Sequence, residues 1–233
     1  MNSKEWFDFN QSTDKEFIFS LDSGKIRVSK YRYVSDTEYD IPSGKLIGVN
    51  MGEWGGGLYY RQRDSTKIIF VNGKRSEDIH PGWFGGLDVP ESNPITKVVK
   101  DCKLLQSGNV QFIFRFKDSI YFLGGLAHGL NFGSLFSLRC KVDSFFITKA
   151  LDLGDAPSAM CIHGDFIYLA GSKGFYIIDR SLNIKTILDN SFWYGLYPTS
   201  VIVLNKQNVF VAIRGGYVKI NPEDKKITLY KAK

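Results

Sequence analysis

One short segment recurs in the C-terminal half of the chain and constrains the fold more than any other feature. Asp118–Gly125 and Asp165–Ser172 align without a gap and share Asp, Ile, Tyr and Gly at matching positions. A weaker third copy begins at Asn208. The copies follow one another at a spacing of roughly 45 residues, which is typical of β-propeller blades. Each copy is therefore expected to be one strand of a repeated module.

Apolar segments around each copy complete a module of four strands. A second apolar strand begins after the copies at Gly133, Gly174 and Gly216, and a similar strand begins upstream at Gly57. Glycine suits these junctions because a tight turn between strands often needs a positive φ. The strands expected in the two clearest modules are 158–163, 166–170, 175–179 and 184–188, then 200–204, 209–213, 217–220 and 226–230.

These modules predict an all-β chain that forms a single small β-propeller over residues 1–233, with antiparallel four-stranded blades. Five blades are expected, with four or six as alternatives. The clearest blades span 110–153, 157–189 and 198–231, and irregular N-terminal blades span 15–106. Strands are expected there at 17–20, 25–34, 45–50 and 66–71, and the strand near Phe17 is expected to close the ring. Helix content is expected to be low, because no stretch combines a sustained apolar repeat at helical spacing with helix caps.

Composition agrees with half-buried strands, and the lack of a targeting segment leads us to expect a cytoplasmic protein. Hydrophobic residues make up 43% and aromatic residues 15%, as expected where flat rings pack across pleated sheets. The three cysteines, Cys102, Cys140 and Cys161, are widely spaced among apolar neighbours, which predicts reduced core thiols. The first residues lead into no apolar run of the kind found in signal peptides or membrane spans, so no membrane contact is expected.

The net charge of +6 and the pI of about 9.1 favour an acidic partner. The basic residues are scattered along the chain. The densest stretches, Arg61–Arg63 and Lys74–Arg75, lack the continuous run or aromatic spacing of a nucleic-acid platform. Nucleic acid is therefore not the expected partner.

Blade geometry sorts the loops between two rims. Turns between strands one and two and between strands three and four lie on one rim, and those turns are short and polar here. The other rim receives longer loops rich in glycine and aromatic residues, which is where rigid scaffolds usually bind partners. We call this second set the loop-rich rim; it comprises 53–56, 126–132, 190–197, 214–215 and an insertion within 74–94. The residues expected to contact a partner are Trp54, Trp83, Phe84, His128, Trp193, Tyr194, Tyr197 and Arg214.

Two alternatives to partner binding remain at this rim. The tryptophans can instead fill gaps between adjacent blades, since large rings often serve packing. The rim also carries the carboxylates Glu53, Asp88, Asp155 and Asp189. An enzyme acting on a sugar or lactone would place Glu53, His128 and Asp189 near a divalent metal in the central channel.

The motifs of nucleophilic and metal-dependent enzymes are missing from the sequence. There is no HExxH pair and no GxSxG elbow, and the histidines at 80, 128 and 163 are far apart in the chain. The leading expectation is therefore a protein with no catalytic residues, no metal and no cofactor.

Four motifs carry a resemblance to small bacterial propeller-like proteins: GEWGGGLYY at 52–60, GGLAHG at 124–129, APSA at 156–159 and RGGYVKI at 214–220. The resemblance covers most of the chain after Lys45. A small cytoplasmic protein with one elaborated face is similar in kind to the immunity proteins of contact-dependent growth inhibition systems. This resemblance implies a non-catalytic protein that covers the active site of a cognate toxin domain, with an acidic patch on that toxin.

Overall fold

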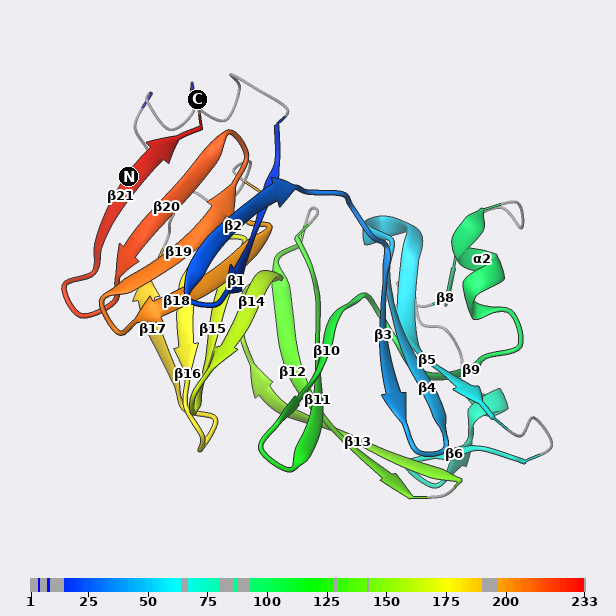
Figure 1. Ribbon diagram of the computed structural model, residues 1–233. Coiled ribbons are helices and arrows are strands. Elements are labelled where there is room, and N and C mark those ends of the chain that lie inside the picture. Colours follow the sequence, from blue (N-terminus) through cyan, green and yellow to red (C-terminus); the bar gives the residue numbers. More distant parts are fainter. Residues whose placement is uncertain are drawn as a thin grey trace. The chain divides into compact units, whose positions relative to one another are not determined.

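The computed structural model describes residues 15–63, 67–79, 86–87, 93–127, 130–141, 143–189 and 197–232, together with Lys4 and Asp8 (Figure 1). The regular secondary structure of the described residues is almost entirely β-strand, which confirms the all-β prediction. The chain divides into two compact units, and each is described by itself. Unit 1 comprises Met1–Tyr33 and Pro157–Lys233, and unit 2 comprises Val34–Ala156.

Unit 1 contains two four-stranded antiparallel sheets and a hairpin, each with its strands in sequence order. The strands agree with the predicted ones to within one or two residues. The first sheet contains β14 (Pro157–His163), β15 (Phe166–Gly171), β16 (Phe175–Ile178) and β17 (Ile184–Leu188). The second contains β18 (Ser200–Asn205), β19 (Asn208–Ile213), β20 (Gly216–Asn221) and β21 (Lys226–Lys231). The hairpin pairs β1 (Phe17–Asp22) with β2 (Lys25–Lys30).

The β18–β21 sheet forms the centre of unit 1 because both of its faces are covered. Val209 and Val211 of β19 join the core shared with the β14–β17 sheet. On the opposite face, Phe19 of the hairpin packs on Ile202 and Ala212. The repeated segment of the sequence corresponds to the second strand of each sheet, and its apolar character follows from burial on both faces.

Unit 2 contains two larger sheets. The first contains β3 (Asp36–Ile41), β4 (Gly44–Asn50) and β5 (Gly55–Gln62), and the outer edge of β5 pairs with β8 (Gly86–Leu87) and β9 (Lys103–Ser107). The second contains β10 (Val110–Phe116), β11 (Ser119–Leu126), β12 (Phe132–Lys141), β13 (Ser144–Asp152), β6 (Phe70–Val71) and β7 (Lys74–Arg75). The short helices are η1 (Gly52–Trp54), η2 (Ser76–Asp78) and α2 (Pro94–Val99).

The N-terminal half differs from its predicted strands in three places. The strand expected at 25–34 ends at Lys30, and the unpredicted strands β3 and β9 complete the first sheet of unit 2. Of the described residues 67–71 in the strand expected at 66–71, Phe70–Val71 form a strand, and this strand pairs parallel to β13 of the second sheet. A local sequence pattern does not reveal this pairing, because the two strands are far apart in the chain.

Helix α2 covers the face of the β3–β5 sheet that points away from the second sheet. Ile95 of the helix packs with Ile47, Val49 and Tyr59. The helix begins after Asn93, whose side-chain oxygen accepts a hydrogen bond from the backbone N–H of Ile95 at 3.0 Å. Asn followed by Pro is a recognised signal for the start of a helix. The prediction of low helix content looked for a sustained apolar repeat and so did not include this short helix. No helix in the described part of the chain is long and apolar enough to cross a membrane.

Backbone irregularities recur at equivalent positions in three sheets. The pairing register shifts between Leu58 and Tyr59, between Leu135 and Phe136, and between Phe175 and Tyr176, each time where the third strand meets the fourth. Such bulges bend and twist a strand. The repeat therefore extends from the sequence to the local shape of the modules.

Glycine is required at the start of the third strands for a different reason from the predicted one. Gly174 and Gly216 do not have a positive φ. A Cβ atom on Gly216 would lie 2.0 Å from the carbonyl oxygen of Tyr230, and one on Gly174 would lie 2.4 Å from the hydroxyl of Tyr176. Glycine is required there because a neighbouring strand or ring comes too close for any side chain.

The substitution Gly216→Ala tests this cause. We expect it to lower the free energy of unfolding by about 2 kcal/mol, because the methyl group forces β20 and β21 apart. The control Gly164→Ala meets no atom within 4 Å and changes only a turn residue with a φ of 57°. Its expected cost is about 1 kcal/mol. Urea unfolding measures both values, and a Gly216→Ala cost no larger than that of the control would contradict this explanation.

Candidate binding surfaces

The structure describes three of the eight residues expected to contact a partner. Trp54 belongs to unit 2, whereas Tyr197 and Arg214 belong to unit 1. The other five lie outside the described residues: Trp83, Phe84, His128, Trp193 and Tyr194.

Trp54 projects from a firmly held turn at one end of unit 2. It ends η1, between β4 and β5, and 57% of its surface is exposed. The side chain of Asn109, itself only 6% exposed, donates to the carbonyl of Gly52 at 2.8 Å and accepts from the N–H of Met51 at 3.2 Å. Asn50 accepts a further bond from the N–H of Gly52. Gap-filling therefore does not account for Trp54 among the described residues.

More apolar surface lies at the same end of unit 2. Asn109 also lines a cavity of about 80 Å³ between β10, β11 and β12, together with Phe122 and Phe132. Phe132 and Leu130 are exposed. The buried asparagine thus connects the turn that carries Trp54 to a small apolar hollow, and the two form one surface.

Tyr197 and Arg214 form a compact cluster in unit 1. The Arg214 guanidinium lies 3.9 Å from the centre of the Tyr197 ring and 3.0 Å from the Glu16 carboxylate. Tyr197 is 49% exposed and has a φ of 51°, a left-handed conformation that is unusual for tyrosine. Arg214 is therefore held from two sides, and its first role is to tie the segment before β1 to the end of β19.

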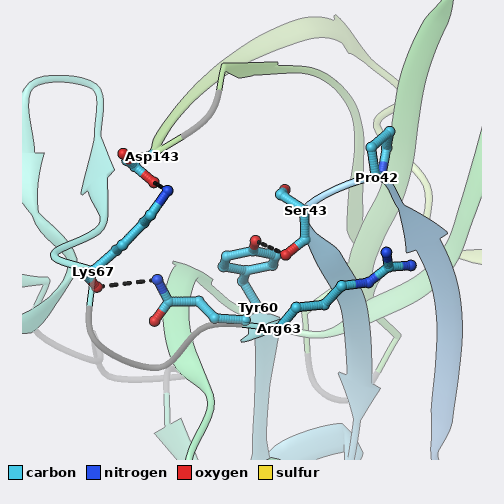
Figure 2. A pocket seen from close by; sticks show the side chains of 7 residues that line it. Pro42, Ser43, Tyr60, Arg63, Lys67 and Asp143 are labelled. Carbon is cyan, nitrogen blue, oxygen red and sulfur yellow. Dashed lines mark hydrogen bonds and ion pairs between the residues drawn. The ribbon is translucent and has the colours of Figure 1, made fainter.

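A polar cavity of about 210 Å³ lies at the opposite end of unit 2, where β3 turns into β4 and β12 turns into β13 (Figure 2). Figure 2 shows the Tyr60 hydroxyl donating to the carbonyl of Ser43, at 2.7 Å, and the Lys67 ammonium beside Asp143, at 3.6 Å. Among the described residues no base lies within hydrogen-bonding distance of the Ser43 hydroxyl. This cavity has no nucleophile–base pair.

The three cysteine thiols are further candidate nucleophiles, and their surroundings keep them protonated. Burial raises the pKa of Cys161 to about 12, and partial desolvation by neighbouring atoms raises that of Cys140 to about 11. Burial also raises the pKa of Cys102, against an opposing effect of Arg61. A reactive thiolate requires a lowered pKa. All three thiols are free, as predicted, but Cys140 is on the surface rather than in the core because it lies near the end of β12.

The acidic residues of the loop-rich rim do not form a metal site in the part of the chain that the structure describes. No group of three or more His, Cys, Asp or Glu side chains converges there. Asp155, expected at the rim, is buried and accepts a hydrogen bond from the Asn131 side chain at 2.8 Å. Asn131 in turn accepts one from the N–H of Ala156. Asp155 therefore orders its own loop. Asp88 and His128 lie outside the described residues.

Three residues that shape these surfaces were not predicted from the sequence: Asn109, Glu16 and Phe132. Asn109 and Glu16 act through partners distant in the chain, and no local pattern marks such contacts. Phe132 was placed in a loop of the loop-rich rim but not among the contact residues. Its position beside Leu130, after a glycine-rich stretch, was the available signal.

Comparisons with known proteins identify no family for this chain. No family model matches it, and no curated protein matches it. Among solved structures it is similar to the crystal structure of the tricorn protease, with a TM-score of 0.42 and 13% sequence identity. The match covers 93% of this chain and 26% of that one, so this chain spans about a quarter of the length of the protein it matches.

The Arg214–Glu16 pair can be tested by a double-mutant cycle. Each side chain is 23% exposed, so we expect Arg214→Ala and Glu16→Ala each to destabilise the protein, with a coupling of about 1 kcal/mol. Urea unfolding of the two single variants and the double variant gives this value. The Arg180–Asp165 pair is a control: its side chains are 63% and 50% exposed, and we expect almost no coupling. Equal couplings for the two pairs would contradict a structural role for Arg214.

Proposed function

We propose that this protein is a non-catalytic binding protein that docks a protein partner on its loop-rich rim. The observation that carries the proposal is the exposed Trp54 on a turn fixed by the buried Asn109. Tryptophan is enriched among the residues that dominate binding energy, and a turn already fixed before binding loses little entropy on association. The adjacent hollow beside Phe132 offers a place for an apolar side chain of the partner.

We further propose that the partner is a toxin domain and that the protein is a cytoplasmic immunity protein, as in contact-dependent growth inhibition. An immunity protein needs a rigid surface that covers the toxin's active site, and it needs no chemistry of its own. The net charge of +6 supports a toxin with an acidic patch, because opposite charges speed association and exclude wrong partners.

For the fold, we propose that the sheets are blades of one small propeller. Support comes from the four sheets whose main strands follow one another in sequence order, and from their recurring bulges. With the β1–β2 hairpin as an incomplete blade, these elements give the five blades that the sequence predicts. Small-angle scattering tests this arrangement, because a closed ring and two units at variable separation have different distance distributions.

The substitution Trp54→Ala tests the proposed docking surface. The partner to use is the product of the gene adjacent to the one encoding this protein. We expect the wild-type protein to co-purify with it and to protect cells that express it. Trp54→Ala should weaken binding at least tenfold, because truncating a central tryptophan typically costs about 2 kcal/mol or more.

Phe70→Ala is the matched control. Phe70 is an exposed aromatic residue of the same unit, but it lies on β6, at the end of unit 2 that holds the polar cavity. We expect this variant to bind and protect like the wild type. Absence of both binding and protection with every neighbouring gene product would refute the immunity function. Equal losses in the two variants would show that the docking surface lies elsewhere.

A further inference from the structure

The β1–β2 hairpin covers only part of the sheet on which it packs. The other sheet-on-sheet contact of unit 1 places four strands against four, whereas the hairpin places two against four. The hairpin lies over β18 and β19 (Figure 1). Its Phe19 ring reaches Tyr217 of β20, with 5.5 Å between the ring centres. The outer part of this face, on β20 and β21, continues beyond β2.

A groove of about 270 Å³ follows the boundary of the covered area. The hairpin contributes Phe17, Phe19 and Val28 to its walls, and β20 with the residues at the end of β21 forms the other side. Tyr217 stacks on Tyr230 with ring centres 4.7 Å apart and planes within 9°. Val28 is 58% exposed. The groove is thus mainly apolar and bordered by flat rings, which suits the side chains of an added strand.

The strand that borders the groove, β2, has one backbone edge with no pairing strand among the described residues. The two-residue turn at Ser23–Gly24 joins Asp22 to Lys25, so alternate residues of β2 exchange hydrogen bonds with β1. The bond from the Tyr31 N–H to the Glu16 carbonyl, at 2.9 Å, continues this alternation. The backbone groups of Ile26, Val28 and Lys30 therefore point away from β1, and no described residue pairs with them.

The surroundings of the groove are basic. The strands β2, β20 and β21 together contain six lysine or arginine residues and no aspartate or glutamate. Three of the six, Lys25, Arg27 and Lys30, are on β2 itself, and Arg27 forms an ion pair with Asp22 of β1. This concentration of charge repels a second copy of the same edge and attracts an acidic chain.

We propose that an extended, acidic segment of a partner protein adds to the free edge of β2 and lies in this groove. Its backbone pairs with Ile26, Val28 and Lys30, its apolar side chains cover Tyr217 and Tyr230, and its acidic side chains approach the lysines. Strand addition of this kind takes affinity from backbone bonds and specificity from alternate side chains. This surface belongs to unit 1 and goes beyond the docking surface around Trp54.

A display library of random ten-residue peptides, selected on the immobilised full-length protein, provides the probe. We expect enriched peptides to alternate apolar or aromatic residues with aspartate or glutamate. Their binding, followed by fluorescence anisotropy of labelled peptide, should weaken as salt concentration rises.

Two variants and their controls locate the binding site. Val28→Pro removes an outward-pointing N–H and no bond to β1, and it should reduce peptide affinity at least tenfold. Val28→Thr keeps the N–H and should retain most of the affinity. Lys219→Glu should also weaken binding, whereas Lys206→Glu, in the β18–β19 turn, should not. Circular dichroism and the Tm establish that each variant is folded.

Clear outcomes would overturn the proposal. One is the absence of enriched peptides, and another is an enriched set that binds Val28→Pro as well as the wild type. A third is a dimer in light scattering that Val28→Pro converts to a monomer, because the occupant would then be a second copy. The proposal is supported if the enriched peptides lose affinity for Val28→Pro and Lys219→Glu and keep their affinity for the controls Val28→Thr and Lys206→Glu.

Discussion

Each of the four larger sheets buries the apolar side chains of its second strand. That strand is β4, β11, β15 or β19, and its apolar side chains alternate between the faces. In unit 1 this is visible at Val209 and Val211 on one face of β19 and Ala212 on the other. Burying a side chain of this size contributes about 1.5–3 kcal/mol. If only one face of such a sheet were covered, about half of the side chains of its second strand would lose this contribution. A second covering layer therefore stabilises these sheets.

The distance along the chain between paired strands explains why the two halves of the sequence differ in how well they can be predicted. The strands from Pro157 to Lys231 pair with their sequence neighbours, so local alternation and turn residues are sufficient to place them. In unit 2, β6 pairs with β13, and Asn72 exchanges hydrogen bonds with the backbone of Ile147. Contacts between such distant residues leave no local pattern. The glycines were located correctly, but the approach of Tyr230 to Gly216 depends on a neighbouring strand and became visible only in three dimensions.

The binding surfaces follow the same division. The exposed aromatic character of the loop at Trp54 could be predicted from its sequence, whereas the asparagine that fixes it comes from another sheet. Arg214 was expected to face a partner, and its contacts with Glu16 and Tyr197 show a prior structural role. The hairpin surface had no sequence signal, because an unpaired edge results from the number of strands that cover a face. Both proposed surfaces combine apolar contact area with a backbone fixed before binding.

Among the described residues the outer edge of β2 is open, and this open edge is what prepares β2 to accept a strand. Hydrogen exchange of individual amides, followed by NMR in the isolated protein, measures this directly. The account predicts alternation along β2: the amides of Arg27 and Ser29, bonded to β1, should exchange on the order of 100-fold more slowly than those of Val28 and Lys30. Equal protection of all four amides would show that the edge is already paired and would contradict the account.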